Sequence, residues 1–231
     1  MALTATQLRA LLKANLHNDS TYSDPDDLNT FLTLGQERIV KDCPQLLGRK
    51  YSTITTTTST REFALATDVY QVYAVWNQTD GFKLTFVPQQ DFIETVERLP
   101  TIGSGPATEY TILGWVAADS VMKLVLNLTP SAAGTLKYWY WWMPAAISGS
   151  STPALSSLGW SELLLNAASM IALGRNDPDA SSFFEKKYDK LMEAARAWHP
   201  AAPDYAPALD PIERAPFGQT LRLPPSYPSR Y

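Results

Sequence analysis

Cysteine and histidine are scarce in this sequence, and their scarcity limits the chemistry that it can perform. There is one cysteine, Cys43, and there are two histidines, His17 and His199. A single cysteine excludes a disulfide within the chain, which fits assembly in a reducing cytoplasm. Neither histidine has a cysteine or a carboxylate nearby at the spacing of a metal site. We therefore expect no metal ion and no cofactor.

Charged residues are also few. They make up 18% of the chain, which has a formal net charge of -4 and a pI near 5.2. A chain without a basic excess is not expected to hold nucleic acid through its phosphates. The low charge content instead indicates that part of the surface is buried against other chains.

Long apolar runs are missing. No uninterrupted run approaches the roughly 18 residues needed to cross a membrane. The first residues lack the basic and apolar regions of a secretory signal. We expect a soluble protein that is made in the cytoplasm and has no membrane partner.

Sequence signatures of catalysis are missing too. Residues 159–162 read Gly-Trp-Ser-Glu, but a nucleophile turn needs glycine where Leu163 stands. Ser161 is better explained as a helix-start residue. Cys43 lacks the basic surroundings of a reactive thiol and is interpreted as a small buried residue. We predict no catalytic residue, and a hydrolase with an unrecognised carboxylate site has the least support.

Residues 1–50 predict a first helical part made of two helices. Leucines at helical spacing give residues 4–17 one apolar stripe. The second helix has a clear start, because Asp24 can cap it and Pro25 suits its first position. Gly35 lies on its apolar stripe, where it would let another helix approach closely.

Residues 51–150 predict a β module. Threonine is frequent from 51 to 60, and Thr79-Asp80-Gly81 is a hairpin-type turn. Strand patterns recur, one of them from Lys83 to Val87, and residues 92–98 indicate a short helix. Five or more short strands separated by turns favour an antiparallel β-sandwich or barrel.

Residues 151–198 predict a second helical part. A helix near 160–173 ends at Gly174, and Asp177-Pro178 repeats the helix start seen at Asp24-Pro25. Each helix pair alone would expose an apolar stripe, so we expect 151–198 to pack on 1–50 as a four-helix bundle. The predicted fold class is α+β, a four-helix bundle with an inserted β module.

Residues 199–231 predict an extended C-terminal arm. Prolines recur throughout it, which excludes a helix or a central strand. Apolar and aromatic residues are spaced along it, whereas a simple linker would be more polar. We expect the arm to order against a partner. The candidate partner-binding residues are Tyr205, Leu209, Ile212, Phe217, Leu221, Leu223, Tyr227 and Tyr231.

The most unusual stretch is an aromatic cluster at residues 138–142. In a strand, Tyr138, Tyr140 and Trp142 face one way, and Trp139 and Trp141 face the other. One face can fill the β core. The other packs on the helices, on a neighbouring subunit, or on a ligand such as a sugar. Trp139 and Trp141 are candidate interface residues, since tryptophan is enriched in such contacts.

The order of these segments resembles a known family. It runs from Leu34-Gly35-Gln36-Glu37-Arg38-Ile39 through Glu62-Phe63-Ala64-Leu65 and Gly134-Thr135-Leu136-Lys137-Tyr138 to Phe184-Glu185-Lys186-Lys187-Tyr188. Over roughly residues 5–197 this succession resembles the head-to-tail adaptor proteins of tailed bacteriophages, the group that includes the tail tubular protein A type.

The resemblance implies a structural virion protein in the neck of the particle. Such adaptors form a ring of twelve subunits under the portal protein. In that arrangement the helical part meets the portal, and the β part faces the next tail component, a nozzle or stopper. DNA passes through the channel without specific binding. Residues 51–150 fit this role, because they hold eight acidic and five basic residues and would not attract DNA phosphates.

The alternative is a binding module. A β-sandwich that recognises carbohydrate through residues 138–142, or another tail-associated binding module, would also use exposed aromatics. The two hypotheses differ in what the aromatic face contacts.

Overall fold

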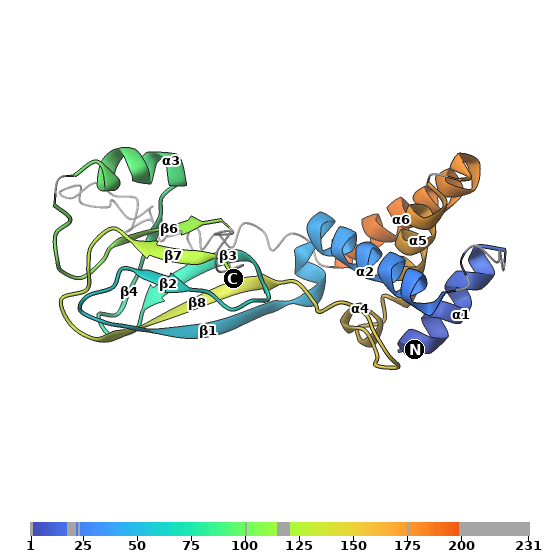
Figure 1. The fold of residues 1–231 in the computed structure, drawn as a ribbon, viewed down its shortest axis with the longest axis horizontal. Coiled ribbons are helices and arrows are strands. Elements are labelled where there is room, and N and C mark those ends of the chain that lie inside the picture. Colours follow the sequence, from blue (N-terminus) through green and yellow to red (C-terminus); the bar gives the residue numbers. More distant parts are fainter. Residues whose placement is uncertain are drawn as a thin grey trace, which may run out of the picture.

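The computed structural model describes residues 2–17, 22, 24–99, 101–114, 121–174 and 176–198. Figure 1 shows an elongated molecule with helices at one end and strands at the other. The chain forms helices first, then strands, then helices again. The predicted α+β class is confirmed. The prolines and aromatics of the predicted arm lie outside the described residues.

The first two helices begin where the sequence indicates. Helix α1 spans Ala5–Asn15, and Thr4 caps it by accepting a hydrogen bond from the Gln7 backbone N–H at 3.3 Å. Helix α2 spans Pro25–Asp42, and the Asp24 carboxylate accepts from the Asp26 N–H at 2.9 Å. Both contacts satisfy backbone donors that a helix start otherwise leaves unpaired. A short 3₁₀ helix, η2, follows at Pro44–Leu47.

The C-terminal helices are α4 (Ala154–Ser157), α5 (Ser161–Leu173) and α6 (Pro178–Trp198). The predicted start at Asp177 is confirmed, because its carboxylate accepts from the Ala180 N–H at 2.9 Å. Helix α5 is the centre of this group, since it packs against α1, α2, α4 and α6. It is buried over most of its length, so it needs no polar face.

The helices share one hydrophobic core, although they come from the two ends of the sequence. Buried side chains from residues 5–46 and 147–195 form a single cluster. Helices α2 and α5 are in closest contact at Gly35, as its place on the apolar stripe predicts. A Cβ there would lie 2.9 Å from the Ala168 backbone nitrogen and 3.3 Å from the Ala167 Cβ. Only glycine therefore fits this crossing. We call this group of helices the helical lobe.

The strands form two four-stranded sheets. Sheet A has the order β1 (Arg49–Thr56), β8 (Gly134–Trp142), β3 (Val69–Asn77) and β4 (Phe82–Lys83), and every pair in it is antiparallel. The predicted hairpin turn joins β3 to β4, and Gly81 adopts a positive φ of 77° in it. Glycine is the residue that adopts this conformation at least cost.

Sheet B has the order β2 (Glu62–Ala64), β7 (Lys123–Leu126), β6 (Glu109–Leu113) and β5 (Thr85–Phe86). Its β5–β6 pair is parallel, whereas the sequence predicts antiparallel strands. Of the two predicted architectures, sandwich or barrel, the closed barrel is wrong, because both sheets are open. Side chains of the two sheets meet in a common core, and we call this part the β lobe.

The single strand predicted from Lys83 to Val87 is wrong in detail. Strand β4 belongs to sheet A and β5 to sheet B, and Leu84 lies between them. The Leu84 N–H donates to the Val75 carbonyl of sheet A, and the Thr85 N–H donates to the Thr108 carbonyl next to sheet B. Leu84 is buried in the core between the sheets. The chain therefore crosses from one sheet to the other at this apolar residue.

A short helical segment covers the outside of sheet B. It consists of helix α3 (Gln89–Phe92) and the π-helix η3 (Ile93–Glu97), which confirms the helix expected near 92–98. Phe92 and Val96 pack with Val125 of β7 in a small separate core. The β lobe thus has three layers, with the α3–η3 segment packed on sheet B.

Asp68, in the loop before β3, joins the strands near the helical lobe. Its carboxylate accepts hydrogen bonds from the Lys50 ammonium at 2.7 Å and from the Tyr140 hydroxyl at 3.1 Å. Its backbone carbonyl accepts from the Met143 N–H at 2.8 Å. One residue thereby connects β1, β8 and the connector that leads back to the helices.

Three buried tyrosines make the fold sensitive to alkaline pH. Burial, with the hydrogen bond and charge of Asp68, raises the pKa of Tyr140 to about 12, and burial raises the pKa of Tyr110 to about 12. Burial and the hydrogen bond to Asp42 also raise the pKa of Tyr188. An unfolded tyrosine has a pKa of about 10, so the folded state keeps protons that the unfolded state releases. This stabilisation is complete below about pH 10 and is lost as the pH rises through about 12.

We expect the free energy of unfolding to fall steeply above about pH 10. Urea denaturation at successive pH values, followed by far-UV circular dichroism, measures this slope. A double variant, Tyr110→Phe with Tyr140→Phe, should show a shallower slope, because phenylalanine has no proton to release. An unchanged slope in this variant would contradict the assignment.

Candidate interaction surface

The aromatic strand β8 places alternate side chains on the two faces of sheet A. Tyr138 and Tyr140 are buried in the β core, with Trp142 packed against that core. Trp139 and Trp141 are half-buried on the opposite, outer face. The predicted alternation is confirmed.

Strand register surrounds the two tryptophans with further side chains. Trp141 lies opposite Arg49 of β1, and Trp139 lies opposite Tyr51. An irregularity in the β3 ladder between Val72 and Ala74 shifts the register there. The Tyr73 ring stands edge-on to Trp141, with centroids 6.4 Å apart and planes at 68°.

Two cations lie over these rings. The Arg49 guanidinium is 5.1 Å from the Tyr73 ring centroid and 5.8 Å from that of Trp141. The Lys137 ammonium is 4.1 Å from the Tyr51 centroid and 5.0 Å from that of Trp139. Contacts of this kind contribute about 0.5–1 kcal/mol each at exposed sites. They hold the aromatic rings and the charges in one ordered layer.

Much of this layer is open to solvent. Tyr51 is 64% exposed, and Trp76 of β3 is 38% exposed. The outward positions of β1, β3 and β8 hold no aspartate or glutamate. We name this surface the sheet A face, and its members are Arg49, Tyr51, Tyr73, Trp76, Lys137, Trp139 and Trp141. Ordered aromatics with cations and without carboxylates are typical of a protein interface.

The sequence predicts Trp139 and Trp141 as interface candidates but does not single out the other members of this face. Arg49 and Tyr51 have the right alternation for a strand, which is the local signal available. Their pairing with β8 joins residues far apart in the chain, and no local pattern specifies it. The predicted arm residues, with His199, lie outside the described residues.

The other candidate residues are accounted for by packing. Cys43 is buried in the helical core, and burial raises the pKa of its thiol, as expected for a structural cysteine. Ser161 is the first residue of α5, but it makes no capping bond. Its hydroxyl instead lies 2.9 Å from that of Ser156 in the core. The prediction that Ser161 stands at a helix start is confirmed, and Ser161 is buried rather than exposed as a nucleophile.

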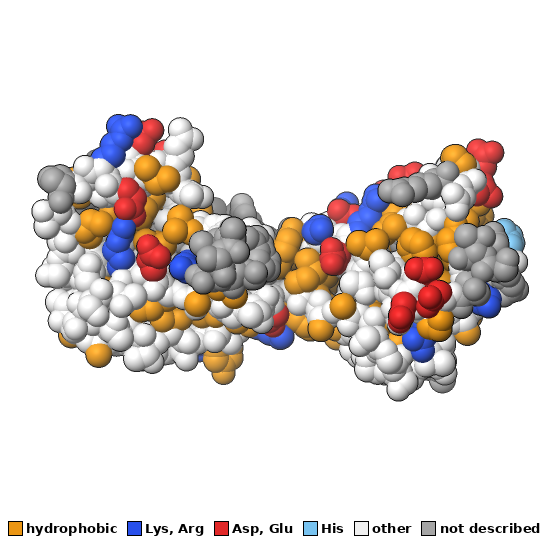
Figure 2. Space-filling model, in the orientation of Figure 1, with side chains coloured by type: hydrophobic (Ala, Val, Ile, Leu, Met, Phe, Trp, Pro, Cys, Tyr) orange, Lys and Arg blue, Asp and Glu red, His pale blue; other side chains and the backbone are white. Residues whose placement is uncertain are grey.

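Two hollows in the described part of the chain are large enough to consider as sites. The larger, of about 610 Å³, lies at the narrow junction between the lobes that Figure 2 shows. Its apolar walls come from the β lobe and the connector, and α2 adds Glu37 and Lys41, whose charged groups are 3.5 Å apart. Paired charges beside an apolar wall suit a protein contact better than they suit catalysis.

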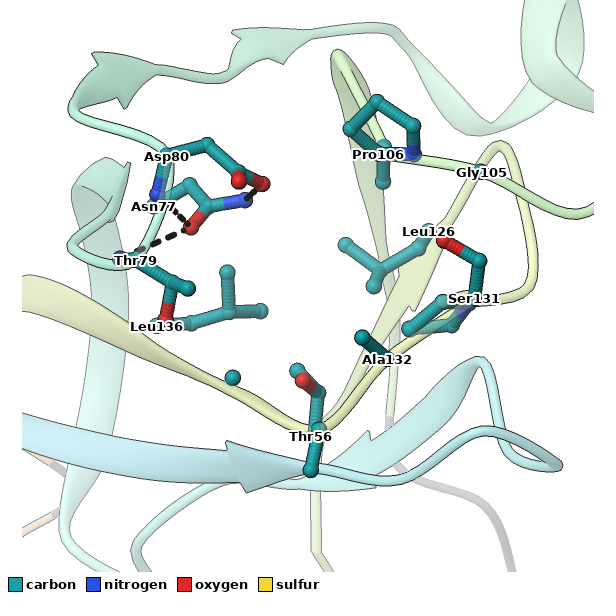
Figure 3. A pocket seen from close by; sticks show the side chains of 14 residues that line it. Thr56, Asn77, Thr79, Asp80, Gly105, Pro106, Leu126, Ser131, Ala132 and Leu136 are labelled. Carbon is teal, nitrogen blue, oxygen red and sulfur yellow. Dashed lines mark hydrogen bonds between the residues drawn. The ribbon is translucent and has the colours of Figure 1, made fainter.

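The smaller hollow, of about 150 Å³, lies beside the β3–β4 turn (Figure 3). Its polar groups are already bonded to one another. The Asn77 amide donates to the Asp80 carboxylate at 2.8 Å, and the Asn77 oxygen accepts from the Thr79 and Asp80 N–H groups. These bonds stabilise the turn and leave no carboxylate pair arranged for acid–base work.

Within the described ranges, no group of three or more His, Cys, Asp or Glu side chains is placed to hold a metal ion. Nor does any helix of those ranges combine the length and the apolar character needed to cross a membrane.

A family model matches most of the chain. No curated protein matches the chain. The model of the SU10 adaptor protein family matches residues 3–209, which include the helical lobe, the β lobe and the sheet A face. The chain therefore belongs to the SU10 adaptor protein family, a family of phage head-to-tail adaptors.

Proposed function

We propose that this protein forms a ring in the neck of a tailed phage particle, between the portal protein and the tail. The observation that carries the proposal is the family match over residues 3–209. A structural adaptor family implies a protein that is not an enzyme. Assembly takes place in the host cytoplasm, and DNA crosses the ring through its channel without specific binding.

The two lobes support a division of labour. We propose that residues 1–50 and 151–198 form one helical domain, a four-helix bundle, which meets the portal. Residues 51–150 form a β domain that faces the next tail component, a nozzle or stopper. Two separate hydrophobic cores at opposite ends of an elongated molecule favour this arrangement, because each end can hold a different partner (Figure 1).

Two parts of the chain are proposed to make the contacts between proteins. The sheet A face, with Trp139 and Trp141, offers ordered aromatic surface to a neighbour. The arm, residues 199–231, offers aromatics from Tyr205 to Tyr231 that gain contact area at the entropic cost of ordering on binding. By the family pattern the ring contains twelve copies.

The test is to mix the purified full-length protein with portal protein and to image the mixture by negative-stain electron microscopy. We expect rings attached to portal. A chain that stays monomeric and never binds portal would contradict the proposal.

Deleting residues 200–231 tests the arm separately. We expect the truncated protein to keep the thermal unfolding midpoint of the full-length chain, because the described residues pack into hydrophobic cores without the arm. Attachment to portal should weaken by at least about tenfold, a loss of about 1.4 kcal/mol. Unchanged attachment would show that the arm does not contribute to the interface. A large fall in the unfolding midpoint would show that the arm is part of the folded core.

The exposed aromatics also support the carbohydrate-binding alternative. The cations over Trp139 and Trp141 occupy ring surface that a sugar would otherwise stack on, which favours the protein interface. Titration with a panel of glycans, followed by tryptophan fluorescence, separates the two. Saturable quenching would support the alternative.

A further inference from the structure

The two outer sides of the β lobe carry surfaces of opposite charge. The sheet A face lies on one side, where Arg49 and Lys137 supply its positive charge. Helix α3 and η3 lie on the other side, over sheet B (Figure 1). The two surfaces are therefore separated by the thickness of the lobe and face away from each other.

The surface of α3 and η3 combines carboxylates with exposed apolar residues. Phe92 and Val96 face inward and are buried, whereas the remaining side chains of the segment are exposed. Ile93 is 44% exposed and Leu99 is 53% exposed. We name this the α3–η3 surface, and its members are Asp91, Ile93, Glu94 and Leu99. The exposed Arg98 lies beside Leu99, so two carboxylates and one cation stand on this side of the lobe.

The carboxylates of this surface are available for a partner. The neighbouring Glu97 is already paired with Arg61. Asp91 and Glu94 form no ion pair with any residue that the structure describes. A surface with uncommitted negative charge and exposed apolar side chains complements one with ordered cations and aromatic rings.

We infer that the sheet A face of one copy docks on the α3–η3 surface of the next copy. The inference rests on the proposed function, since it names the contact between subunits of the ring. Two different surfaces on opposite sides of one lobe make a head-to-tail contact, and repeated contacts of this kind close into a ring when the rotation allows. Arg49 and Lys137 then meet Asp91 and Glu94, and the aromatic rings meet Ile93 and Leu99.

A symmetric contact between two sheet A faces fits the structure less well. It would bring Arg49 and Lys137 of one copy against the same cations of the other. Like charges facing each other oppose association. The α3–η3 surface, in contrast, supplies both the opposite charge and the apolar area.

Charge reversal tests the contact in the full-length protein. One variant carries Arg49→Glu and Lys137→Glu, a second carries Asp91→Lys and Glu94→Lys, and a third carries all four changes. We expect the first two to lower ring formation with portal by at least about tenfold, a loss of about 1.4 kcal/mol. The third restores it, because the charges are exchanged across the same contact. Counting rings on portal by negative-stain microscopy measures the effect.

A matched control carries Thr58→Glu and Ser59→Glu, which add two negative charges to the exposed loop between β1 and β2, outside both surfaces and outside the helical lobe. It should form rings as the unmodified protein does. Circular dichroism of every variant checks that both lobes stay folded. If a variant fails to fold, carbodiimide coupling of the unmodified ring, made from isotope-labelled and unlabelled copies, gives a second measurement. We expect Lys137 of one copy to be joined to Asp91 or Glu94 of another.

Each outcome decides the inference. Failure of the four-change variant to form rings, or coupling of copies only through other residues, would overturn the docking contact and leave the adaptor role standing. Saturable binding of single-stranded DNA to the sheet A face in the assembled ring would also overturn it. If the unmodified protein forms no ring with portal, both the contact and the proposed function fail.

Discussion

Replacing Gly35 with leucine is expected to destabilise the helical lobe by about 3 kcal/mol, the upper part of the range for overpacking a core. The backbones of α2 and α5 meet at this position. A Cβ on residue 35 would lie 2.9 Å from the backbone nitrogen of Ala168, and no rotamer change can move a backbone atom aside. The two helices must separate, and the core that α5 shares with its neighbours opens.

The size of the loss should follow the size of the side chain. Gly35→Ala gains up to about 1 kcal/mol of helix propensity, which offsets part of the steric cost. We expect it to lose less stability than Gly35→Leu. Urea denaturation followed at the helical circular dichroism band measures both.

Gly114→Leu is the matched control. A Cβ at Gly114 would meet no atom of the described residues within 4 Å, and this glycine does not have a positive φ. We expect its free energy of unfolding to stay close to that of the unmodified protein. Equal losses for Gly35→Leu and Gly114→Leu would show that the close helix crossing does not determine stability.

Replacing Tyr138 with alanine is expected to cost about 3–5 kcal/mol, the range for removing a large buried aromatic side chain. Tyr138 is 2% exposed, and its ring packs with that of Tyr140 at a centroid distance of 5.4 Å. Its hydroxyl accepts a hydrogen bond from the Ala66 N–H at 3.0 Å. The substitution leaves both a cavity and an unpaired backbone donor.

Tryptophan fluorescence is the sensitive measurement for this variant. Five of the seven tryptophans belong to residues 51–150, so the emission reports mainly on the β lobe. The helical circular dichroism band should persist at urea concentrations where the fluorescence of the variant has changed, because the two cores share no residue.

Tyr51→Ala is the control on the opposite face of the same sheet. Tyr51 is 64% exposed, so its loss should change stability by no more than about 0.5–1 kcal/mol, including its contact with Lys137. A cost for Tyr51→Ala as large as that for Tyr138→Ala would contradict the assignment of inner and outer faces.

The helix starts and the alternation of β8 could be read from the sequence because their causes are local. Asp24 and Asp177 each cap a helix through a backbone N–H only two or three residues away. The side chains of Trp139 and Trp141 stand on the other face of the sheet from those of Tyr138 and Tyr140, because side chains alternate along any strand. These signals act between residues that are close in the sequence, so they do not depend on the tertiary fold.

The crossing at Leu84 could not be predicted in this way. Residues 83–87 have the composition of one strand, and the split between β4 and β5 depends on which strands lie beside them. The Val75 carbonyl in sheet A accepts a hydrogen bond from Leu84, and the Thr108 carbonyl next to sheet B accepts one from Thr85. One short segment therefore contributes a strand to each sheet. The parallel β5–β6 pair has the same origin.

By itself, the sequence determined the helix starts at Asp24 and Asp177, the β character of the middle region, the face on which each aromatic of β8 stands and the place of Gly35 on an apolar helix stripe. Only the tertiary structure decided that Arg49 and Lys137 lie over the exposed rings, and that acidic residues of α3 and η3 occupy the opposite side of the lobe. The physical reason is the separation along the sequence of the residues that interact. Caps and strand alternation act between near neighbours, whereas strand register and layer order are set when residues distant in the chain bury apolar surface together.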